Sequence, residues 1–279
     1  MQKEIKEKGE EEKRMKTLGI VGCGHLGSIV AKAWKEGLLP DYELIGVASR
    51  SEESAKRLAK ETGCRSCASI EELIEMKPDF IAETASVKMV KEYALSILQH
   101  GIQLVVLSIG AFADDDFFEK VKETAAENQV KVHIASGAIG GFDVLRTLHV
   151  MSLSGIGEEK SEIHNITNPP VFKRFPFFAE RLTTEEDDCE VFCDTAKHAI
   201  EMLPTRVNVA VATAIATAGP TNTTSRMTSR PGVVGDYQHI TASIPGYSAD
   251  LNIYSSTSDI AGWSIVALLR NLDSPIQFQ

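Results

Sequence analysis

The sequence predicts an α/β protein in which a doubly wound parallel sheet of the Rossmann type is followed by a second α+β domain. Two observations predict this fold. A glycine-rich turn follows a short apolar run near the N-terminus, and strand-like segments then alternate with helix-like segments as far as residue 135. Strands that alternate with helices are joined by crossovers, which generate a parallel sheet. After residue 138 this alternation ends, which indicates a second domain.

The alternating region is the expected dinucleotide-binding domain, residues 17–138. We expect its strands at residues 18–21, 43–48, 79–85, 103–108 and 130–135, and its helices at residues 26–36, 52–61, 70–76, 87–100 and 114–128. The preceding residues 1–16 are almost wholly charged, and we interpret them as a solvated extension.

The second domain is expected over residues 139–255. Its predicted helices are residues 142–153, 184–198 and 207–218, and its predicted strands are residues 161–168, 239–244 and 248–255. Residues 219–236 are rich in Gly, Pro, Ser and Thr, so we expect a loop there. A last helix, residues 260–271, belongs to a C-terminal segment, residues 256–279, that is expected to pack back on the first domain.

The composition restricts the partners. The 279 residues carry a formal net charge of −10 and no basic stripe, so nucleic acid is not an expected partner. No apolar run approaches the roughly 20 residues that span a membrane, and the N-terminus lacks the apolar centre of a secretory signal. The odd number of cysteines, five, fits a reducing compartment, expected to be the cytoplasm. No metal site is expected, although a zinc site or a redox pair is the alternative to ordinary reduced thiols at Cys64, Cys67, Cys189 and Cys193.

The first glycine turn, Gly-Cys-Gly-His-Leu-Gly over residues 22–27, predicts a binding site for a dinucleotide pyrophosphate. Gly22 permits a tight turn, Gly24 leaves room for the phosphates, and Gly27 lets the helix pack against the strand. The helix that begins at His25 and Leu26 offers free N–H groups and a positive dipole end to the anion. A glycine turn that binds nothing is the alternative.

The residues after the second strand favour NADP over NAD. No Asp or Glu, the residues that bind the ribose hydroxyls in NAD enzymes, is found in the segment Ala-Ser-Arg-Ser over residues 48–51. Arg50 offers a charge-assisted contact to a 2′-phosphate, and Ser49 or Ser51 offers a hydroxyl. NAD, or use of both cofactors, stays open, because Arg50 could instead stack on the adenine or point to solvent.

A second glycine-rich segment, Ser-Gly-Ala-Ile-Gly-Gly-Phe-Asp over residues 136–143, follows the fifth strand. Three glycines there indicate close backbone approach or unusual dihedral angles. In such sheets the nicotinamide and the substrate meet where the chain passes to the second domain. A plain linker turn is the alternative.

From Thr17 onward the chain resembles the L-aspartate dehydrogenases. The resemblance rests on four motifs: Glu-Thr-Ala-Ser at residues 83–86, Ser-Ile-Gly-Ala-Phe-Ala-Asp at 108–114, the segment 136–143, and Val-Asn-Val-Ala at 207–210. It implies that Ala138 and Asn208 contact the cofactor and that Ala85 and Ser86 flank the nicotinamide. It also implies a homodimer, with the second domain providing substrate binding, catalysis and dimerisation.

The family's catalytic histidine lies in an Asn-Thr-His or Asn-Ile-His segment before a strand, and His239 is the expected match. His239 also follows the long predicted loop. A histidine with a near-neutral pKa can pass a proton to or from an amine or a carbonyl oxygen as hydride moves. A structural histidine is the alternative.

The resemblance implies NAD(P)-dependent oxidative deamination of L-aspartate, or of a related small amino acid, to an imine and then to an oxo acid and ammonia, and the reverse reaction. Two departures weaken the assignment of aspartate itself. The family's Thr-Arg-Lys-Pro is replaced by Ile-Thr-Asn-Pro-Pro at residues 166–170, and its Asn-Pro-Lys-Thr-Ser by Tyr-Ser-Ser-Thr-Ser at 254–258. In addition, the first Asn of the family's Asn-Val-Asn-Val-Ala run is Arg206 here. A dicarboxylate needs cationic or N–H donors at both ends.

Other basic residues are possible substitutes, namely Lys173, Arg174, Arg226 and Arg230. Residues 221–226 either line the pocket or form a surface loop. Two further alternatives stay open. One is an oxidoreductase of the same fold that acts on a different small amine, keto acid or aldehyde. The other is an NADP-binding protein that has lost catalysis.

Overall fold

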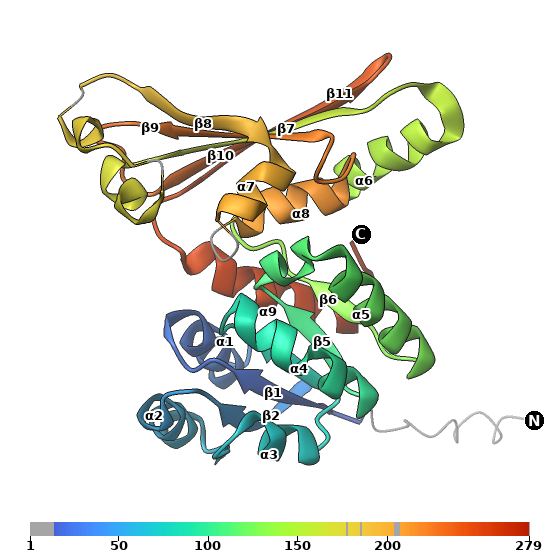
Figure 1. Cartoon of the computed structure of the whole chain (residues 1–279). Coiled ribbons are helices and arrows are strands. Elements are labelled where there is room, and N and C mark those ends of the chain that lie inside the picture. The colour runs from blue at the N-terminus through green and yellow to red at the C-terminus, as the bar shows by residue number, and fades with distance from the viewer. Residues whose placement is uncertain (1–13, 177, 185, 204–206, 279) are drawn as a thin grey trace, which may run out of the picture.

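The first sheet has six parallel strands in the order β3-β2-β1-β4-β5-β6. The computed structural model describes residues 14–176, 178–184, 186–203 and 207–278 (Figure 1). The strands are β1 (Lys16–Val21), β2 (Tyr42–Ala48), β3 (Arg65–Ser66), β4 (Phe80–Glu83), β5 (Gln103–Val106) and β6 (Val132–Ile134). A parallel sheet that starts at its centre and runs outward in both directions is doubly wound. The predicted Rossmann fold is therefore confirmed.

The helices of this domain are α1 (His25–Lys35), α2 (Glu52–Thr62), α3 (Ile70–Glu75), α4 (Val87–Gln99), the short η1 (Ile109–Ala113) and α5 (Asp115–Glu127). Four of them begin at a side chain that accepts a hydrogen bond from the backbone N–H three residues later, namely Ser51, Ser69, Ser86 and Asp114. Such caps satisfy N–H groups that the helix itself leaves without partners, so they fix where each helix begins.

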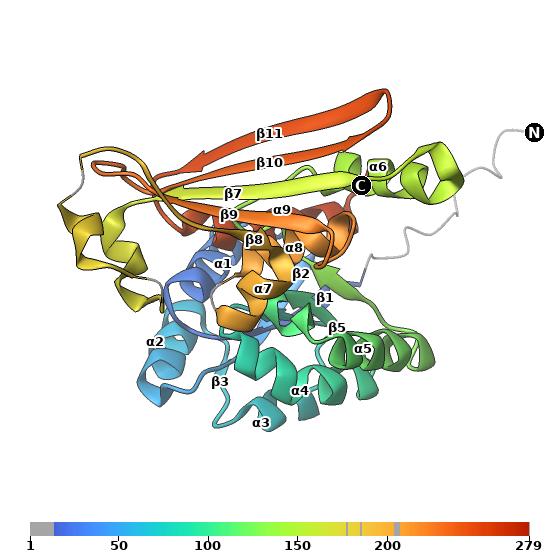
Figure 2. The same ribbon diagram turned by 45° about the horizontal axis from the view of Figure 1, so that its top comes forward.

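The second sheet has five strands in the order β11-β10-β7-β9-β8. They are β7 (Lys160–Thr167), β8 (Cys189–Thr195), β9 (Thr223–Ser229), β10 (Asp236–Ile244) and β11 (Tyr247–Ser255), and only the β7–β9 pair is parallel. Helices α6 (Phe142–Met151), α7 (Ala196–Met202) and α8 (Asn208–Ala216) cover the face toward the first domain (Figures 1 and 2). We call this the inner face. Shorter turns are η2 (Ser152–Ile156), η3 (Pro169–Arg174) and η4 (Glu180–Thr183).

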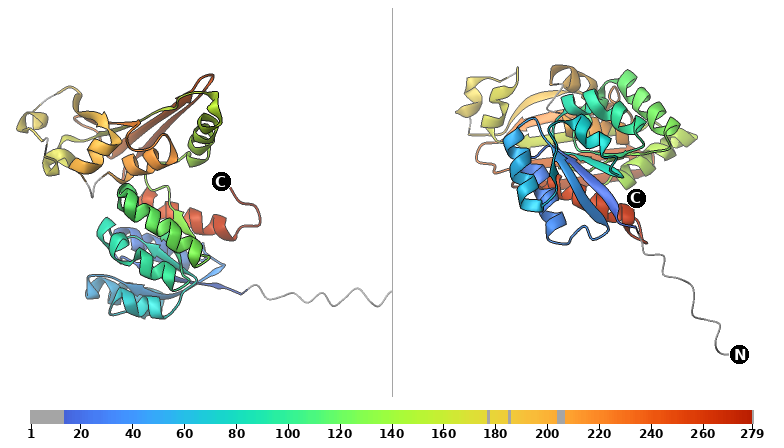
Figure 3. Two further views of the ribbon diagram at one scale, coloured as in Figure 1. Left: turned by 45° about the vertical axis from the view of Figure 1, so that its right-hand side comes forward. Right: turned by 90° about the horizontal axis from the view of Figure 1, so that it is seen from below.

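The last helix, α9 (Asp259–Asp273), returns to the first domain and packs on α1 (Figure 3). The Tyr42 hydroxyl donates a hydrogen bond of 3.0 Å to the carbonyl of Leu269. Gly262 allows close approach, because a Cβ there would lie 3.0 Å from the Ile29 side chain. None of the helices in the described part of the chain has the length and apolar character that a membrane crossing requires.

Two of the predicted elements are wrong. Residues 184–198, predicted as a helix, contain β8 and only the first turn of α7, and residues 219–236, predicted as a loop, contain β9. The inner-facing positions of β9 are Thr223, Ser225, Met227 and Ser229, which are nearly all hydroxyl residues although all four are buried. Because the buried residues of β9 are mostly polar, apolar and polar residues do not alternate along it, and the pattern that predicts a strand is missing.

Buried hydroxyls replace apolar packing at this strand. The Ser161 and Thr223 hydroxyl oxygens are 2.8 Å apart, and the Thr217 Oγ1 lies 3.1 Å from Ser161 Oγ and 2.7 Å from the carbonyl of Thr213. These contacts join β7, β9 and the end of α8. Hydrogen bonding of this kind lets polar side chains occupy a core position.

We therefore predict that Thr217→Val destabilises the protein, because the buried hydroxyls of Ser161 and Thr223 lose a partner. The free energy of unfolding should fall by about 1–3 kcal/mol, measured by urea denaturation. Thr221, which is exposed, provides the control, and Thr221→Val should change the free energy by less than about 0.5 kcal/mol. Equal effects of the two substitutions would contradict the proposed role of the hydroxyl cluster.

Candidate functional site

The first glycine turn is closed by backbone packing on one side and open on the other. Gly22 has φ +100°, and a Cβ there would lie 2.7 Å from the carbonyl carbon of Thr84. A Cβ at Gly27 would lie 1.9 Å from the carbonyl oxygen of Gly22, whereas a Cβ at Gly24 would meet nothing within 4 Å. Helix α1 begins directly after Gly24 without a side-chain cap. The residues present therefore fit a pyrophosphate at the N-terminus of α1.

The carboxylate of Glu83 organises the loops after β4 and β5. Glu83 has no exposed surface. Its Oε1 accepts hydrogen bonds from the N–H groups of Ala85 (2.7 Å) and Ser86 (2.9 Å) and from the Ser108 hydroxyl (2.8 Å). Its Oε2 accepts from the N–H groups of Leu107 (3.1 Å) and Ser108 (2.8 Å). The N–H groups of Ala85 and Ser86 are therefore already hydrogen-bonded to Glu83. A ligand beside these two residues would contact their remaining atoms.

Burial raises the pKa of Glu83, and the hydrogen bonds from Ser108, Ala85 and Leu107 oppose that shift. Four of the five partners are N–H groups, which can only donate, so the cradle fits the ionised carboxylate. Thr84 connects this cradle to the glycine turn, since its hydroxyl donates to the carbonyl of Gly22 at 2.7 Å. The edge at which parallel strands end is therefore held rigid on both sides of β4.

Two contacts connect this edge to the second domain and to α9. The Asn208 Oδ1, on the first residue of α8, accepts a hydrogen bond of 2.9 Å from the N–H of Gly110. The N–H of Gly137 donates to the Ser264 hydroxyl of α9 at 3.0 Å. Ala138, which is partly exposed, follows Gly137 directly. Ala138 and Asn208 therefore both lie at the junction of the two domains.

Two arginines follow β2, one directly after the strand and one on α2, and the sequence analysis missed the second. Arg50 follows β2, is exposed, and has no hydrogen-bond or ion-pair partner among the residues that the structure describes. Arg57 of α2 donates hydrogen bonds of 3.2 Å to the carbonyl of Cys23 and to the Ser28 hydroxyl. Arg57 escaped notice because its position depends on how α2 is rotated against α1.

Serine and cysteine side chains nearby have structural roles. The Ser51 hydroxyl caps α2, so it accepts a hydrogen bond from the N–H of Ser54 rather than being free. Burial raises the pKa of Cys23 to about 11, and its thiol lies 3.6 Å from the carbonyl of Ala48. No group of three or more His, Cys, Asp or Glu side chains in the described residues could hold a metal ion. Ser49, which is partly buried, keeps the place expected for it at the end of β2.

His239, the predicted catalytic residue, does not face the first domain. On β10 the residues Gln238, Ile240, Ala242 and Ile244 are buried at alternate positions, which defines the inner face. His239 lies between them and faces the opposite side. Its Nε2 is 3.1 Å from Asp250 Oδ1, and both side chains are at least one-third exposed. A displacement of one residue along a strand moves a side chain to the other face, so a motif match alone does not fix the orientation of His239.

Gln238 is a buried polar residue of β10 that does face the first domain. It is 4% exposed, and its Oε1 has no hydrogen-bond partner in the described part of the chain. In the sheet it pairs with Asn165 of β7 and Ile253 of β11. The Ile253 side chain lies 3.9 Å from the position of a Cβ at Gly140. Gln238 is thus a neighbour of the second glycine turn, and the alternation of buried residues after it could have revealed its orientation.

Of the basic residues proposed as substitutes, Arg226 and Arg230 lie on the outer side of the second sheet. Arg226 forms ion pairs with Glu162 at 3.0 Å and with Glu190, and Arg230 forms one with Asp188. Lys173 is an exposed residue of η3. Arg174 is the last residue of the same turn, and Arg206 lies outside the described residues. Most of residues 221–226 belong to β9 rather than to a loop.

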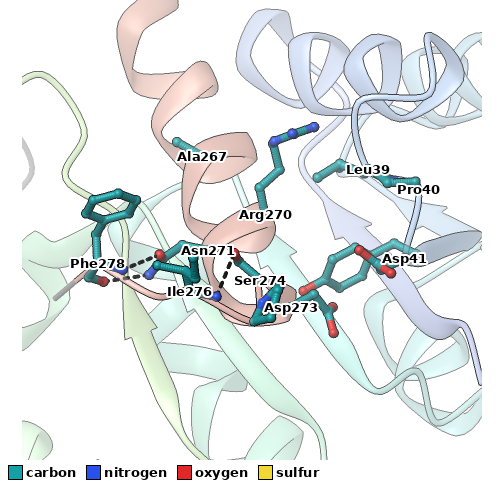
Figure 4. Close-up of a pocket in the computed structure, with 12 residues that line it drawn as sticks. Leu39, Pro40, Asp41, Ala267, Arg270, Asn271, Asp273, Ser274, Ile276 and Phe278 are labelled. Atoms are coloured by element: carbon teal, nitrogen blue, oxygen red, sulfur yellow. Dashed lines mark hydrogen bonds between the residues drawn. The ribbon is translucent and has the colours of Figure 1, made fainter. Parts of the chain in front are cut away.

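A cavity of about 600 Å³ lies elsewhere, between the start of β2 and the C-terminal segment (Figure 4). Leu39, Tyr42, Arg270 and Phe278 are among the residues that line it. Tyr42 is the first residue of β2, whereas the glycine turn packs against its last residues. This cavity is therefore at the wrong edge of the sheet for the cofactor.

Comparison with known proteins identifies the family. Residues 22–135 match the family model described as homoserine dehydrogenase, NAD binding domain, and residues 143–272 match aspartate dehydrogenase, C-terminal. An L-aspartate dehydrogenase of Methanococcus maripaludis (strain C5) is 30% identical over 275 residues, which cover 94% of this chain and 99% of the relative. The chain belongs to the L-aspartate dehydrogenase family.

This assignment confirms the resemblance that the sequence motifs indicated. An L-aspartate dehydrogenase of Methanocaldococcus jannaschii is 28% identical, with 94% of this chain and 99% of the relative covered. The crystal structure of an aspartate dehydrogenase from Thermotoga maritima has the same fold, with a TM-score of 0.74, 23% identity and coverage of 95% and 99%. As a member of the aspartate dehydrogenase family, the protein is a nicotinamide-dependent oxidoreductase of the class that acts on the CH–NH2 group.

We predict that Glu83→Gln destabilises this aspartate dehydrogenase relative. The new amide N–H would face backbone donors, so the free energy of unfolding should fall by about 2–4 kcal/mol in urea denaturation. Reduced cofactor should also bind more weakly, as measured by its fluorescence, because the loops around Ala85 and Ser108 lose their common acceptor. Glu127→Gln, at an exposed position of α5, is the matched control and should change neither value. A stable Glu83→Gln variant would contradict the cradle's role.

Proposed function

We propose that the protein catalyses the NAD(P)-dependent oxidative deamination of L-aspartate, or of a related small amino acid, and its reversal. The observation that carries this proposal is the relationship to L-aspartate dehydrogenases over 94% of the chain, which includes both domains. The amine is oxidised to an imine, and water then converts the imine to an oxo acid and ammonia.

Each side of the crevice contributes a defined part. The nicotinamide, when bound, accepts hydride from the substrate carbon. The N-terminus of α1 and the turn of Gly22, Gly24 and Gly27, with the backbone of His25 and Leu26, bind the pyrophosphate. Ala85, Ser86, Ala138 and Asn208 flank the nicotinamide. The protein binds and orients the reactants, which accounts for much of the rate enhancement in such enzymes.

A different small amine, keto acid or aldehyde is the second candidate substrate. The observation that favours it is the pairing of Arg226 and Arg230 with acidic side chains on the outer side of the sheet. Neither guanidinium is then available to bind the second carboxylate of aspartate.

A panel of amines separates these candidates. With either oxidised cofactor, L-aspartate should give the highest kcat/KM, measured by the absorbance of reduced cofactor, and oxaloacetate with ammonia should be turned over in the reverse direction. Turnover of non-acidic amines alone would support the second candidate. Tight cofactor binding with no turnover of any substrate would indicate a protein that has lost catalysis.

NADP is the proposed preferred cofactor. Arg50 is exposed beside the N-terminus of α2, and no carboxylate ends β2. Both features favour the 2′-phosphate of NADP over the free ribose hydroxyl of NAD. Ser49 provides a hydroxyl at the same edge, whereas the Ser51 hydroxyl is committed to the helix cap.

Arg50→Ala should raise the Kd of NADP by about 10-fold or more while leaving the Kd of NAD within about twofold, because a charge-assisted contact contributes about 1.5–3 kcal/mol. Isothermal titration calorimetry measures both constants. Arg146→Ala, on an exposed position of α6, is the control for loss of one positive charge. Equal weakening of both cofactors by Arg50→Ala would remove the assignment of NADP.

A homodimer located in the cytoplasm completes the proposal. The family resemblance supports the dimer. The compartment is supported by the cysteines, all five of which are free thiols. Sedimentation analysis of the purified protein tests the dimer.

A further inference from the structure

We infer that Gln238 contacts the substrate nitrogen and that the hydride step at this site proceeds without a titrating imidazole on β10. This inference rests on the proposed deamination and adds a residue to its mechanism. Its starting point is the orientation of the strand. The buried alternation from Gln238 to Ile244 fixes which side chains reach the inner face, and His239 is not among them.

The position of Gln238 along the strand places it near the cofactor edge. Strand β11 ends at Ser255, close to Gln238's partner Ile253, and leads within a few residues into α9. The first residue of α9, Asp259, lies 2.7 Å from His25 of the first glycine turn, measured from Oδ1 to Nε2. The end of the second sheet that carries Gln238 is therefore connected, through the start of α9, to the glycine turn of the first domain (Figure 1).

The buried side-chain oxygen of Gln238 has no hydrogen-bond donor among the described residues. Buried polar atoms are almost always hydrogen-bonded, because an unmet acceptor has lost water without a replacement. Oε1 of Gln238 is such an acceptor, and the buried Ser229 Oγ, on the same face of β9, also has no partner among the described residues. Ser229 lies two strands away, in the neighbouring row, so the Gln238 oxygen is the acceptor that a polar ligand at this end of β10 would complete.

The surroundings of Gln238 contain few groups that titrate. Its row across the sheet is Met227, Asn165, Gln238 and Ile253, and none of these side chains ionises near neutral pH. Helix α8 carries no ionisable residue. On β10 itself the partly buried Asp236, two residues before Gln238, shares its face. The titratable groups on the other elements packed around this end are Asp143, with His149 and its partner Glu159, on the α6 side, and His25 with Asp259 at the glycine turn.

An amide suits the hydride step of an amine. As hydride leaves the substrate carbon, the nitrogen lone pair forms the C=N bond and the nitrogen becomes positively charged. The product of this step is an iminium ion, and no proton is transferred if the amine binds in its neutral, unprotonated form. The Gln238 oxygen can accept a hydrogen bond from the N–H of the amine, and this bond strengthens as the nitrogen becomes positive. The proton transfers of the later hydrolysis then use water.

The experiment compares Gln238→Leu, Gln238→His and His239→Asn with the wild type, using the best amine of the panel. Gln238→Leu should lower kcat/KM by about 10- to 100-fold, since one polar contact to the reacting nitrogen is lost. It should leave the Kd of reduced cofactor within about twofold and should not lower the unfolding midpoint, because it removes an orphaned polar atom. A merely structural Gln238 would instead show a lower midpoint.

The pH profile gives an independent readout. Wild-type kcat/KM should rise toward alkaline pH with the neutral amine and show no inflection near about 6.5, the ordinary pKa of histidine. Gln238→His should add that inflection, and His239→Asn, on the opposite face, should match the wild type throughout.

The inference is overturned if Gln238→Leu retains wild-type kcat/KM, or if His239→Asn abolishes activity. A wild type that binds cofactor but oxidises no amine would instead overturn the proposed function, and this inference with it.

Discussion

The buried carboxylate of Glu83 holds together the two loops that border the site. Glu83 ends a strand whose four residues are all buried, and every one of its five partners donates a hydrogen bond to it. An ionised group in such a place is stable only when its hydrogen bonds are complete. The loops after β4 and β5 are consequently held at fixed positions relative to one another.

From Glu83 the contacts continue in both directions. On one side Thr84 bonds to Gly22 and keeps the phosphate-binding turn closed. On the other side Ser108 leads to Gly110, whose N–H reaches Asn208 in the second domain. The cofactor turn and the second domain are therefore connected by hydrogen bonds between side chains and backbone, made by Thr84, Glu83 and Asn208. Rigid positioning of this kind is what hydride transfer between two bound molecules requires.

In the second domain, the alternation of side chains along a strand determines which residues face the first domain. Neighbouring residues on β10 face opposite sides, so Gln238 approaches the first domain while His239 lies beside Asp250 on the outer face. On this strand the side chain that the proposed mechanism uses is therefore an amide, which cannot exchange a proton. In that mechanism the substrate amine and water provide the proton transfers.

The sequence predicts the first domain well because its strands are short apolar runs and its turns need glycine. It fails at β9, where buried hydroxyls of Thr223 and Ser225 hide the strand, and at β8, whose acidic start imitates a helix N-terminus. The glycine turn could be found because steric exclusion at Gly22 and Gly27 depends on local backbone. The orientation of Gln238 could have been found from the apolar alternation that follows it, whereas Arg57 could not, since its position depends on which helix lies opposite.

A crystal structure of the protein with bound NADP+ tests the central claim most directly. The account predicts the pyrophosphate against Gly24 and the first turn of α1, the 2′-phosphate at Arg50, and the nicotinamide on the side of the second sheet that carries Gln238. A cofactor bound away from this turn, or a nicotinamide that reaches His239 instead of Gln238, would contradict it.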